Sequence, residues 1–407
     1  MQYLAPPRRP ACPDDAVASP GRRLCLQVGA LSAAGALAGL TGCATGAAAP
    51  PGPRALPHTT GLELPWGMAF LPDGRLLVTE RPGRLRLVEV DGRLVSAPVA
   101  GVPEVEYRGH GGLLDIVVDR FFERNRQVYL SYTAACAGDE PPLNCLMAAR
   151  ATLSADATAL ENLQPIFRQW PPVESGENLG GRLAVSRDGM LFITLGDRRE
   201  PGERVHAQDL AYHQGKVVRI RTDGSVPGDN PFVHTPGALP EIWSYGHRNP
   251  QGAMLHPDSD ELWTSEHGPF GGDEINITRH GRNYGWPVIT YGCEYDGCAA
   301  IGEGPTKAGM EQPLTWWGQP SIAPSNLLLY TGGRFPQWRG SLFVATLAGL
   351  ALWRIELGGS PAEPQVLRRE PLFAELGQRL RDVQQSPDGG LYLLTDGAPA
   401  SILRIEA

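Results

Sequence analysis

The stretch that decides the fold is Pro72-Asp73-Gly74-Arg75-Leu76-Leu77-Val78-Thr79-Glu80, in which a turn leads directly into a short apolar strand. An Asp-Gly pair before a run of β-favouring residues is a strong local signal for a hairpin. The same plan recurs three times, and twice more in weaker form. The clear copies are 187–194, 257–266 and 387–396, and the weaker ones are 125–132 and 337–347.

Six copies of this phrase predict an all-β fold, a six-bladed β-propeller of four-stranded antiparallel blades, with one blade for each copy. The composition agrees, because 50 Gly and 38 Pro among 407 residues leave little room for long helices, while 42% hydrophobic residues supply a core. A β-sandwich with chance Asp-Gly turns is the alternative. In a propeller, the loops at one end of the channel carry function, so chemistry is expected where the phrases end.

The first 60 residues differ from the rest of the chain. An apolar run from Leu24 to Leu40 follows Arg22-Arg23 and ends at Leu40-Thr41-Gly42-Cys43. A basic region, a short apolar run and a small-residue site describe an export signal. The ending resembles a bacterial lipobox, in which Cys43 is lipidated, and the Arg pair loosely resembles a twin-arginine signal. An ordinary apolar leader that happens to contain Cys is the alternative.

These features predict three segments. They are a lipoprotein-type signal peptide at 1–42, a flexible tether at 43–60 and one domain at 61–407. We therefore expect an exported protein, either periplasmic or anchored to the outer membrane, that contacts the membrane only through its lipid. The net charge of −8 argues against a nucleic-acid binder. Whether the protein is a monomer or a dimer stays open.

Four of the seven cysteines lie in the predicted domain. They form two pairs that are close in sequence and flanked by turn-forming residues. The simplest pairing is Cys136 with Cys145 and Cys293 with Cys298, in an oxidising compartment. A four-thiol zinc site is a poor alternative because no CxxC spacing is present.

Two stretches contain polar groups that ordinary propeller strands do not need. The first is 107–115, a Gly-rich turn that contains His110. The second is 244–252, where Arg248 and Asn249 offer donors suited to carboxylates or sugar hydroxyls. Both stretches are also compatible with ordinary surface loops.

Two further stretches suggest charged ligands. In 265–287, consecutive carboxylates among glycines can present oxygens to a hard cation such as calcium, although EF-hand spacing is absent. In 378–382, strand alternation puts Arg379 and Arg381 on one face. Two adjacent guanidiniums repel unless an anion lies between them, either a carboxylate-bearing ligand or a buried Asp.

Together these motifs resemble the soluble PQQ-dependent aldose sugar dehydrogenases, also grouped as glucose/sorbosone dehydrogenases. The resemblance covers residues 62–405, and the segment 241–287 is its most specific part. It implies an enzyme that oxidises aldose sugars at the anomeric carbon to lactones, passing a hydride to PQQ with calcium as Lewis acid. The physiological electron acceptor is not identified by the sequence.

The resemblance also implies cofactor-binding roles for single residues. Arg248 and Asn249 match a pair that contacts the quinone, and Tyr295 matches a residue at its pocket. Arg379 and Arg381 match arginines that bind its carboxylates, so an anionic cofactor would relieve their repulsion.

The implied metal ligands form two groups. The backbone carbonyls of Gly268 and Pro269 match those that hold the cofactor's calcium. Glu274 and Tyr284 match a second, structural calcium site.

Three positions depart from the family pattern. Asn178 stands where the family has its general base, a His four residues before Arg182, and a neutral amide cannot accept a proton. His110 replaces a Gln, and Ala348 replaces a cofactor-binding Lys. We therefore expect His110 to contact the cofactor and to act as the base, with Asn178 orienting the substrate hydroxyl.

Two other functions remain open at this point. One is a catalytically impaired propeller that binds sugar or PQQ without turnover, which the losses at Asn178 and Ala348 motivate. The other is a metal-dependent hydrolase of lactones, which would leave the paired arginines and Arg248-Asn249 without a purpose.

Overall fold

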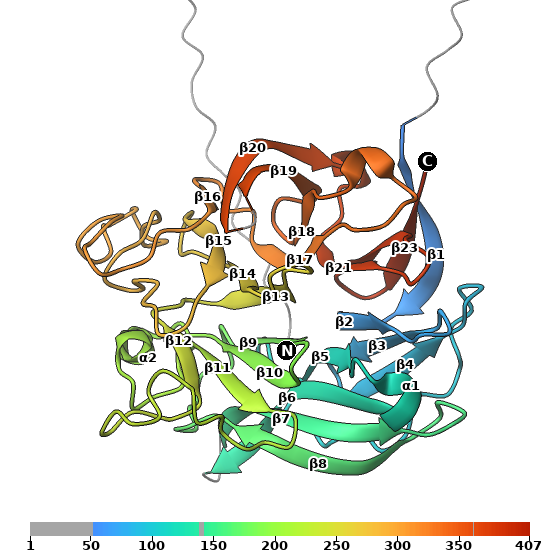
Figure 1. Ribbon diagram of the computed structural model, residues 1–407, viewed down its shortest axis with the longest axis horizontal. Helices are drawn as coiled ribbons and strands as arrows, with labels where there is room; N and C mark the ends of the chain where they lie inside the picture. Colours follow the sequence, from blue (N-terminus) through green and yellow to red (C-terminus); the bar gives the residue numbers. More distant parts are fainter. Residues whose placement is uncertain (1–51, 138–141, 361) are drawn as a thin grey trace, which may run out of the picture. The chain divides into compact units, whose positions relative to one another are not determined.

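The computed structural model describes residues 52–137, 142–360 and 362–407. Within these residues, six antiparallel sheets are arranged in a ring, which confirms the six-bladed β-propeller (Figure 1). Five blades have four strands. Blade 1 has three, and isolated bridges at Leu94 and Val99 occupy the place of its fourth strand. Blade 1 therefore keeps a fourth, outer segment, which pairs through these isolated bridges instead of a continuous ladder.

The strand bounds follow the chain from blade to blade. Blade 1 comprises β2 (Pro65–Phe70), β3 (Leu76–Glu80) and β4 (Arg84–Val88). Blade 2 comprises β5 (Leu113–Val118), β6 (Gln127–Ala137), β7 (Leu143–Leu153) and β8 (Leu160–Arg168). Blade 3 comprises β9 (Gly180–Val185), β10 (Met190–Leu195), β11 (Lys216–Arg221) and β12 (Ile242–Tyr245).

The second half of the ring repeats the plan. Blade 4 comprises β13 (Pro250–Leu255), β14 (Leu262–Glu266), β15 (Asp273–Thr278) and β16 (Thr315–Trp317). Blade 5 comprises β17 (Pro324–Leu329), β18 (Leu342–Thr346), β19 (Leu352–Ser360) and β20 (Glu363–Leu372). Blade 6 comprises β21 (Leu380–Gln385), β22 (Leu391–Thr395), β23 (Ala400–Glu406) and β1 (Arg54–Leu62). The short helices are α1 (Phe122–Asn125), α2 (Pro201–Arg204), η1 (Val205–Gln208), η2 (Pro336–Trp338) and η3 (Ala374–Leu376).

Each sequence phrase forms the second strand of a blade. The four clear copies end in β3, β10, β14 and β22, and the weaker copies end in β6 and β18. The strands that precede them, from β2 around to β21, contact one another in a ring and surround the channel. The phrase therefore predicts blade number correctly because it repeats the turn between the first and second strands.

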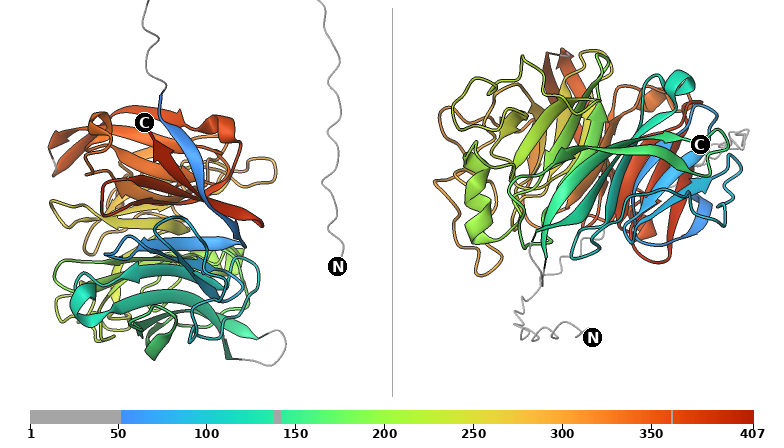
Figure 2. Two further views of the ribbon diagram at one scale, coloured as in Figure 1. Left: turned by 90° about the vertical axis from the view of Figure 1, so that its right-hand side faces the viewer. Right: turned by 90° about the horizontal axis from the view of Figure 1, so that it is seen from below.

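The ring closes by pairing the two ends of the described chain. β1 pairs antiparallel with β23, from Arg54 opposite Glu406 to Leu62 opposite Ala400. Figure 2 shows β1 (blue) beside β23 (red). The tether boundary at residue 60 is therefore wrong, since residues 54–60 belong to blade 6. β1 is hard to recognise in the sequence because the strand contains Pro57 and is largely exposed. Its partner strand also lies at the far end of the chain.

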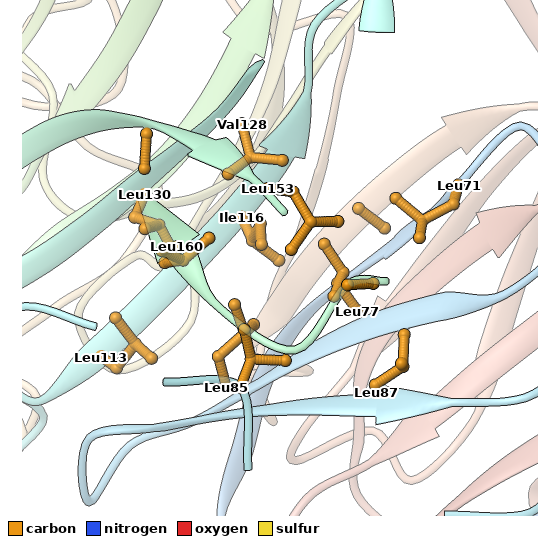
Figure 3. Packing of buried hydrophobic residues seen from close by; sticks show 14 of the residues in the cluster. Leu71, Leu77, Leu85, Leu87, Leu113, Ile116, Val128, Leu130, Leu153 and Leu160 are labelled. Atoms are coloured by element: carbon orange, nitrogen blue, oxygen red, sulfur yellow. The ribbon is translucent and has the colours of Figure 1, made fainter. Parts of the chain in front are cut away.

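Six hydrophobic clusters hold the blades together, one at each interface between neighbouring blades. The largest, between blades 1 and 2, includes Leu71, Leu85, Ile116 and Leu130 (Figure 3). Full burial of each such side chain contributes roughly 1.5–3 kcal/mol. The cluster between blades 3 and 4 is small by comparison.

Both predicted disulfides are present, Cys136–Cys145 across β6 and β7 and Cys293–Cys298 in the loop after β15. Cys43 and the predicted signal peptide lie outside the described residues, so export and lipidation stay predictions. In the part of the chain that the structure describes, no helix has the length and apolar character needed to cross a bilayer.

Candidate active site

A cavity of about 240 Å³ lies where the inner strands begin. Three of its lining residues are arginines, Arg81, Arg379 and Arg381, and only one, Asp396, is a carboxylate. We call it the channel cavity. His110, Asn249 and Gln251 also line it, together with Trp66, Leu179, Gly180, His267, Ala323 and Leu347. Its charge suits an anionic ligand with more than one carboxylate.

The two predicted arginines share Asp396. Arg379 Nε donates to Asp396 Oδ2 at 2.8 Å, and Arg381 donates to Oδ1 from a nitrogen at 3.2 Å. Burial lowers the pKa of Arg381, and the charge of Asp396 opposes this shift. The anion that separates the guanidiniums is thus a protein carboxylate, so their pairing alone does not require a ligand. Two positive charges against one negative charge still leave the pair cationic.

A buried ion cluster supports the floor of the channel cavity. Arg182 on β9 donates to Asp115 Oδ1 on β5 at 2.9 Å, and it lies 3.5 Å from Asp382 Oδ2 on β21. The Trp66 ring lies 4.1 Å below its guanidinium carbon. Burial raises the pKa of Asp115 to about 6, and Arg182 opposes the shift. The cluster joins three inner strands and fixes the bottom of the cavity.

His110 is held at both ring nitrogens. Its Nδ1 accepts the backbone N–H of Asn178 at 3.3 Å, and its Nε2 lies 3.1 Å from Glu177 Oε2. Desolvation lowers the pKa of His110, and the carboxylate of Glu177 opposes this effect. The imidazole is therefore neutral at neutral pH, which is the form that can accept a proton.

Asn178 lies directly beside His110, as the exchange of these two positions suggested. Its side chain is buried, and Nδ2 donates to Asp197 Oδ1 at 2.9 Å. Asp197 also accepts from Trp286 Nε1 at 2.7 Å. Asp197 thus takes one of the two side-chain N–H groups of Asn178, and Asn178 itself does not line the channel cavity.

Arg248, Asn249 and Tyr295 lie at the same end of the channel. Arg248 donates to the carbonyl of His267 at 3.0 Å and approaches the Tyr295 hydroxyl at 3.5 Å. These two residues line a hollow of about 170 Å³. Asn249 Oδ1 accepts the backbone N–H of Gly180 at 3.1 Å, which ties blade 4 to blade 3 at the edge of the channel cavity. The tyrosine is exposed and the other two side chains are buried.

The predicted metal ligands Gly268, Pro269, Glu274 and Tyr284 line one small cavity of about 20 Å³, roughly the space of one water molecule or ion. Glu266 lines it too, and we call it the acidic cavity. Burial and the charge of Glu266 raise the pKa of Glu274 to about 8. Asn276 Nδ2 donates to both carboxylates, at 2.8 and 3.1 Å.

The donor set of the acidic cavity fits a hard cation. Two buried carboxylates that repel each other, with carbonyl-bearing loop residues around them, are oxygen ligands of the kind calcium prefers. A Cβ on Gly268 would meet Gly272 backbone atoms at 2.3 Å, so only glycine permits this loop to fold so closely. Within the described ranges, no group of three or more His, Cys, Asp or Glu side chains is placed to hold a metal.

Two histidines near these cavities were missed by the sequence analysis. His267 lines both cavities, and its Nε2 is buried without a hydrogen-bond partner. His247 bridges Ser244 Oγ at 2.8 Å and Glu266 Oε1 at 3.1 Å. The motif Ser265-Glu266-His267-Gly268 suggested side-chain and backbone oxygen ligands. No local pattern showed that His247 would reach Glu266.

The Ser244, His247 and Glu266 chain has the order of groups found in nucleophilic hydrolases. Both Ser244 and His247 are completely buried, and the Tyr284 ring is stacked 4.6 Å from His247. A substrate cannot reach the hydroxyl, so this chain orients Glu266 and does not support hydrolysis.

Ala348 follows Leu347, which lines the channel cavity, and is itself exposed. Its backbone N–H donates to the carbonyl of Ile322 at 3.0 Å. The position is therefore at the rim, where a longer side chain has room to turn toward the arginines.

A β-propeller with a cationic cavity beside an acidic one has the charges to accept an organic anion and a metal cation side by side. Residues 62–404 match the family described as Glucose / Sorbosone dehydrogenase. The chain belongs to this family.

Individual relatives agree. The chain is 42% identical over 346 residues to the aldose sugar dehydrogenase YliI of Escherichia coli, covering 84% of this chain and 90% of that protein. Among solved structures, the apo form of the soluble aldose sugar dehydrogenase of Escherichia coli gives a TM-score of 0.81 at 39% identity, covering 87% and 99% of the two chains. The PQQ-bound aldose sugar dehydrogenase of Streptomyces coelicolor gives 0.69 at 30% identity, covering 88% and 99%.

Proposed function

We propose that the protein oxidises aldose sugars at the anomeric carbon to lactones, using PQQ and calcium. The observation that carries the proposal is the channel cavity, whose lining holds three arginines against one carboxylate beside His110. When bound, PQQ would accept a hydride, and calcium would polarise the quinone carbonyl that receives it. A family neighbour with PQQ bound supports this choice of cofactor.

Different residues would bind the cofactor and the calcium. Arg379, Arg381 and Asn249 would hold the cofactor's carboxylates and polar edge in the channel cavity, with Arg248 and Tyr295 at its mouth. The backbone carbonyls of Gly268 and Pro269 in the acidic cavity would hold the cofactor's calcium, while Glu274 and Tyr284, which line the same cavity, keep their proposed role at a second, structural calcium.

Proton removal falls to His110. As the anomeric hydroxyl loses its proton and the carbon loses a hydride, the sugar gives up two electrons and becomes the lactone. Neutral Nδ1 of His110 would accept that proton, displacing the long 3.3 Å contact with Asn178 N–H. The oxygen of Asn178 would orient the hydroxyl.

A dye-linked assay tests the proposal. Purified protein supplied with PQQ, calcium and an aldose should reduce an electron-acceptor dye, and leaving out any one of the three should stop it. Oxidation of glucose to a lactone, followed by mass balance, identifies the product. PQQ binding without dye reduction by any aldose would contradict turnover and favour a binding protein.

Export remains part of the proposal. The lipobox-like ending at Cys43 and the two disulfides support a periplasmic or outer-membrane-anchored enzyme. Labelling cells with a palmitate analogue should mark the wild-type protein and spare a Cys43→Ala variant.

A further inference from the structure

Three consecutive residues of the loop before β9, 176–178, contact His110 in the turn before β5. The carbonyl of Gly176 accepts the backbone N–H of His110 at 2.8 Å. The carboxylate of Glu177 lies 3.1 Å from Nε2, and the N–H of Asn178 donates to Nδ1 at 3.3 Å. A Cβ on Gly109 would meet the Gly176 carbonyl oxygen at 2.7 Å, so the two loops pack too closely for a side chain there.

These contacts define the state of the ring. A neutral imidazole has one N–H donor and one lone pair. Because Nδ1 faces a backbone donor, it carries the lone pair, and Nε2 must therefore carry the hydrogen and donate it to Glu177. A carboxylate beside Nε2 thus keeps the lone pair on Nδ1 and stabilises the imidazolium that forms after proton transfer.

Glu177 is itself held in place. Arg199 donates to the same Oε2 atom at 3.2 Å, and its guanidinium carbon lies 5.8 Å from the ring centre of Tyr295. Arg199 has a positive φ of 68°, a left-handed conformation that is uncommon for a residue with a side chain. Its backbone N–H donates to Asp197 at 2.8 Å, which stabilises the turn that projects its side chain toward Glu177.

We propose that Glu177 is a positioning residue for His110, fixing the tautomer and the orientation in which Nδ1 accepts the substrate proton. The proposal rests on the proposed function, since it gives His110 a proton to accept.

Several charged groups face His110 from other elements. Desolvation is the largest influence and lowers its pKa, Glu177 raises it, and Arg81, Arg381 and Arg199 lower it. His267 also faces it across the channel cavity. Replacing the carboxylate by a neutral amide therefore leaves only lowering influences, so Glu177→Gln should move the pKa of His110 downward.

The first experiment needs no cofactor. Protein labelled with ¹⁵N-histidine is titrated by NMR, with the His110 signals assigned from a His110→Gln variant. The wild type should show the Nε2–H tautomer, and Glu177→Gln should titrate at lower pH. Glu174→Gln is the matched control, because it removes an exposed carboxylate from the same loop, and it should titrate like the wild type.

The second experiment measures dye-linked kinetics on the loaded enzyme. Glu177→Gln should lower kcat by about tenfold or more, a fraction of the range for general-base assistance. It should leave KM within about twofold and move the acidic limb of the kcat/KM profile to lower pH. Glu177→Asp, which restores the charge, should return that limb toward the wild-type position.

The outcomes separate the two claims. An unchanged His110 titration and an unchanged acidic limb in Glu177→Gln would overturn the positioning role. If the His110 titration shifts in Glu177→Gln but the wild-type protein oxidises no aldose, the proposed function is refuted. The interaction between Glu177 and His110 would still stand.

Discussion

The channel cavity and the acidic cavity are neighbours with opposite charge. Arginines 81, 379 and 381 line the first with one carboxylate, while the carboxylates of Glu266 and Glu274 line the second with one arginine, Arg248. His267 lines both. Their volumes also differ, about 240 Å³ against about 20 Å³. The larger, cationic cavity suits an organic anion and the smaller one suits a single cation, and this difference is the reason that we propose both ligands for one site.

The largest expected effect on kcat comes from removing His110, the proposed base, which lines the channel cavity. His110→Ala should reduce kcat by about 10²–10⁴-fold, because it removes general-base assistance. PQQ affinity should change far less, since the arginines remain. Dye-linked kinetics with a parallel PQQ titration measures both quantities, and full activity in the variant would remove His110 from the mechanism.

The same base predicts a pH dependence. Burial lowers the pKa of His110 from its usual 6.5, so the imidazole stays neutral until the pH falls below that value. The kcat/KM of the wild type should therefore be flat around neutrality and decline only on the acidic side. A decline that begins above pH 7 would contradict a neutral His110.

The second effect tests the charge of the channel cavity. Arg379→Gln combined with Arg381→Gln should weaken PQQ binding by about 100-fold or more, since each hydrogen bond between charged groups is worth roughly 1.5–3 kcal/mol. Arg334→Gln is the control, because Arg334 is an exposed arginine paired with Asp388. Equal PQQ affinity in the double variant and the control would show that the cavity is not the cofactor site.

The third effect tests the acidic cavity separately. Glu274→Gln should weaken calcium binding by about tenfold, because ligand charge sets calcium affinity. It should also raise the melting temperature of the metal-free protein near neutral pH, because burial and Glu266 raise the pKa of Glu274 to about 8 and folding must therefore protonate this carboxyl, a cost that a neutral amide does not carry. Calorimetric titration and thermal unfolding check the two results, and calcium affinity equal to wild type would place the ion elsewhere.

The smallest effect is expected when Ala348 is replaced by the Lys that the family has at this position. Ala348→Lys should tighten PQQ binding by about twofold to fivefold, the range for one partly exposed ion pair. The matched variant Ala348→Gln should not. If both variants bind PQQ like the wild type, the rim position does not reach the cofactor.

The sequence predicted the repeated parts of the fold better than its ends. The Asp-Gly turn before each second strand is a local signal, so six blades could be counted from it. β1 could not, because its partner Ile405 lies at the other end of the chain and Pro57 disguises the strand.

The site residues that could be predicted from the sequence are those that lie close together in a short motif. Arg379 and Arg381 were found from strand alternation, and both line the channel cavity. The contacts that cross between loops were not found. Three such contacts are the ion pair of Asp396 with the arginines, the contact of Glu177 with His110, and the approach of Glu266 to Glu274. Each depends on how the blades pack, which no short spacing in the sequence reveals.

The central claim is that the channel cavity binds PQQ with calcium beside it. Titration of the purified full chain with PQQ, with and without calcium, measured by the quinone absorption spectrum, tests it most directly. The quinone spectrum should be perturbed and saturable, should require calcium for tight binding, and should need about 100-fold more PQQ in the Arg379→Gln, Arg381→Gln variant. A spectrum of free PQQ at every ratio, in the presence of calcium, would contradict it.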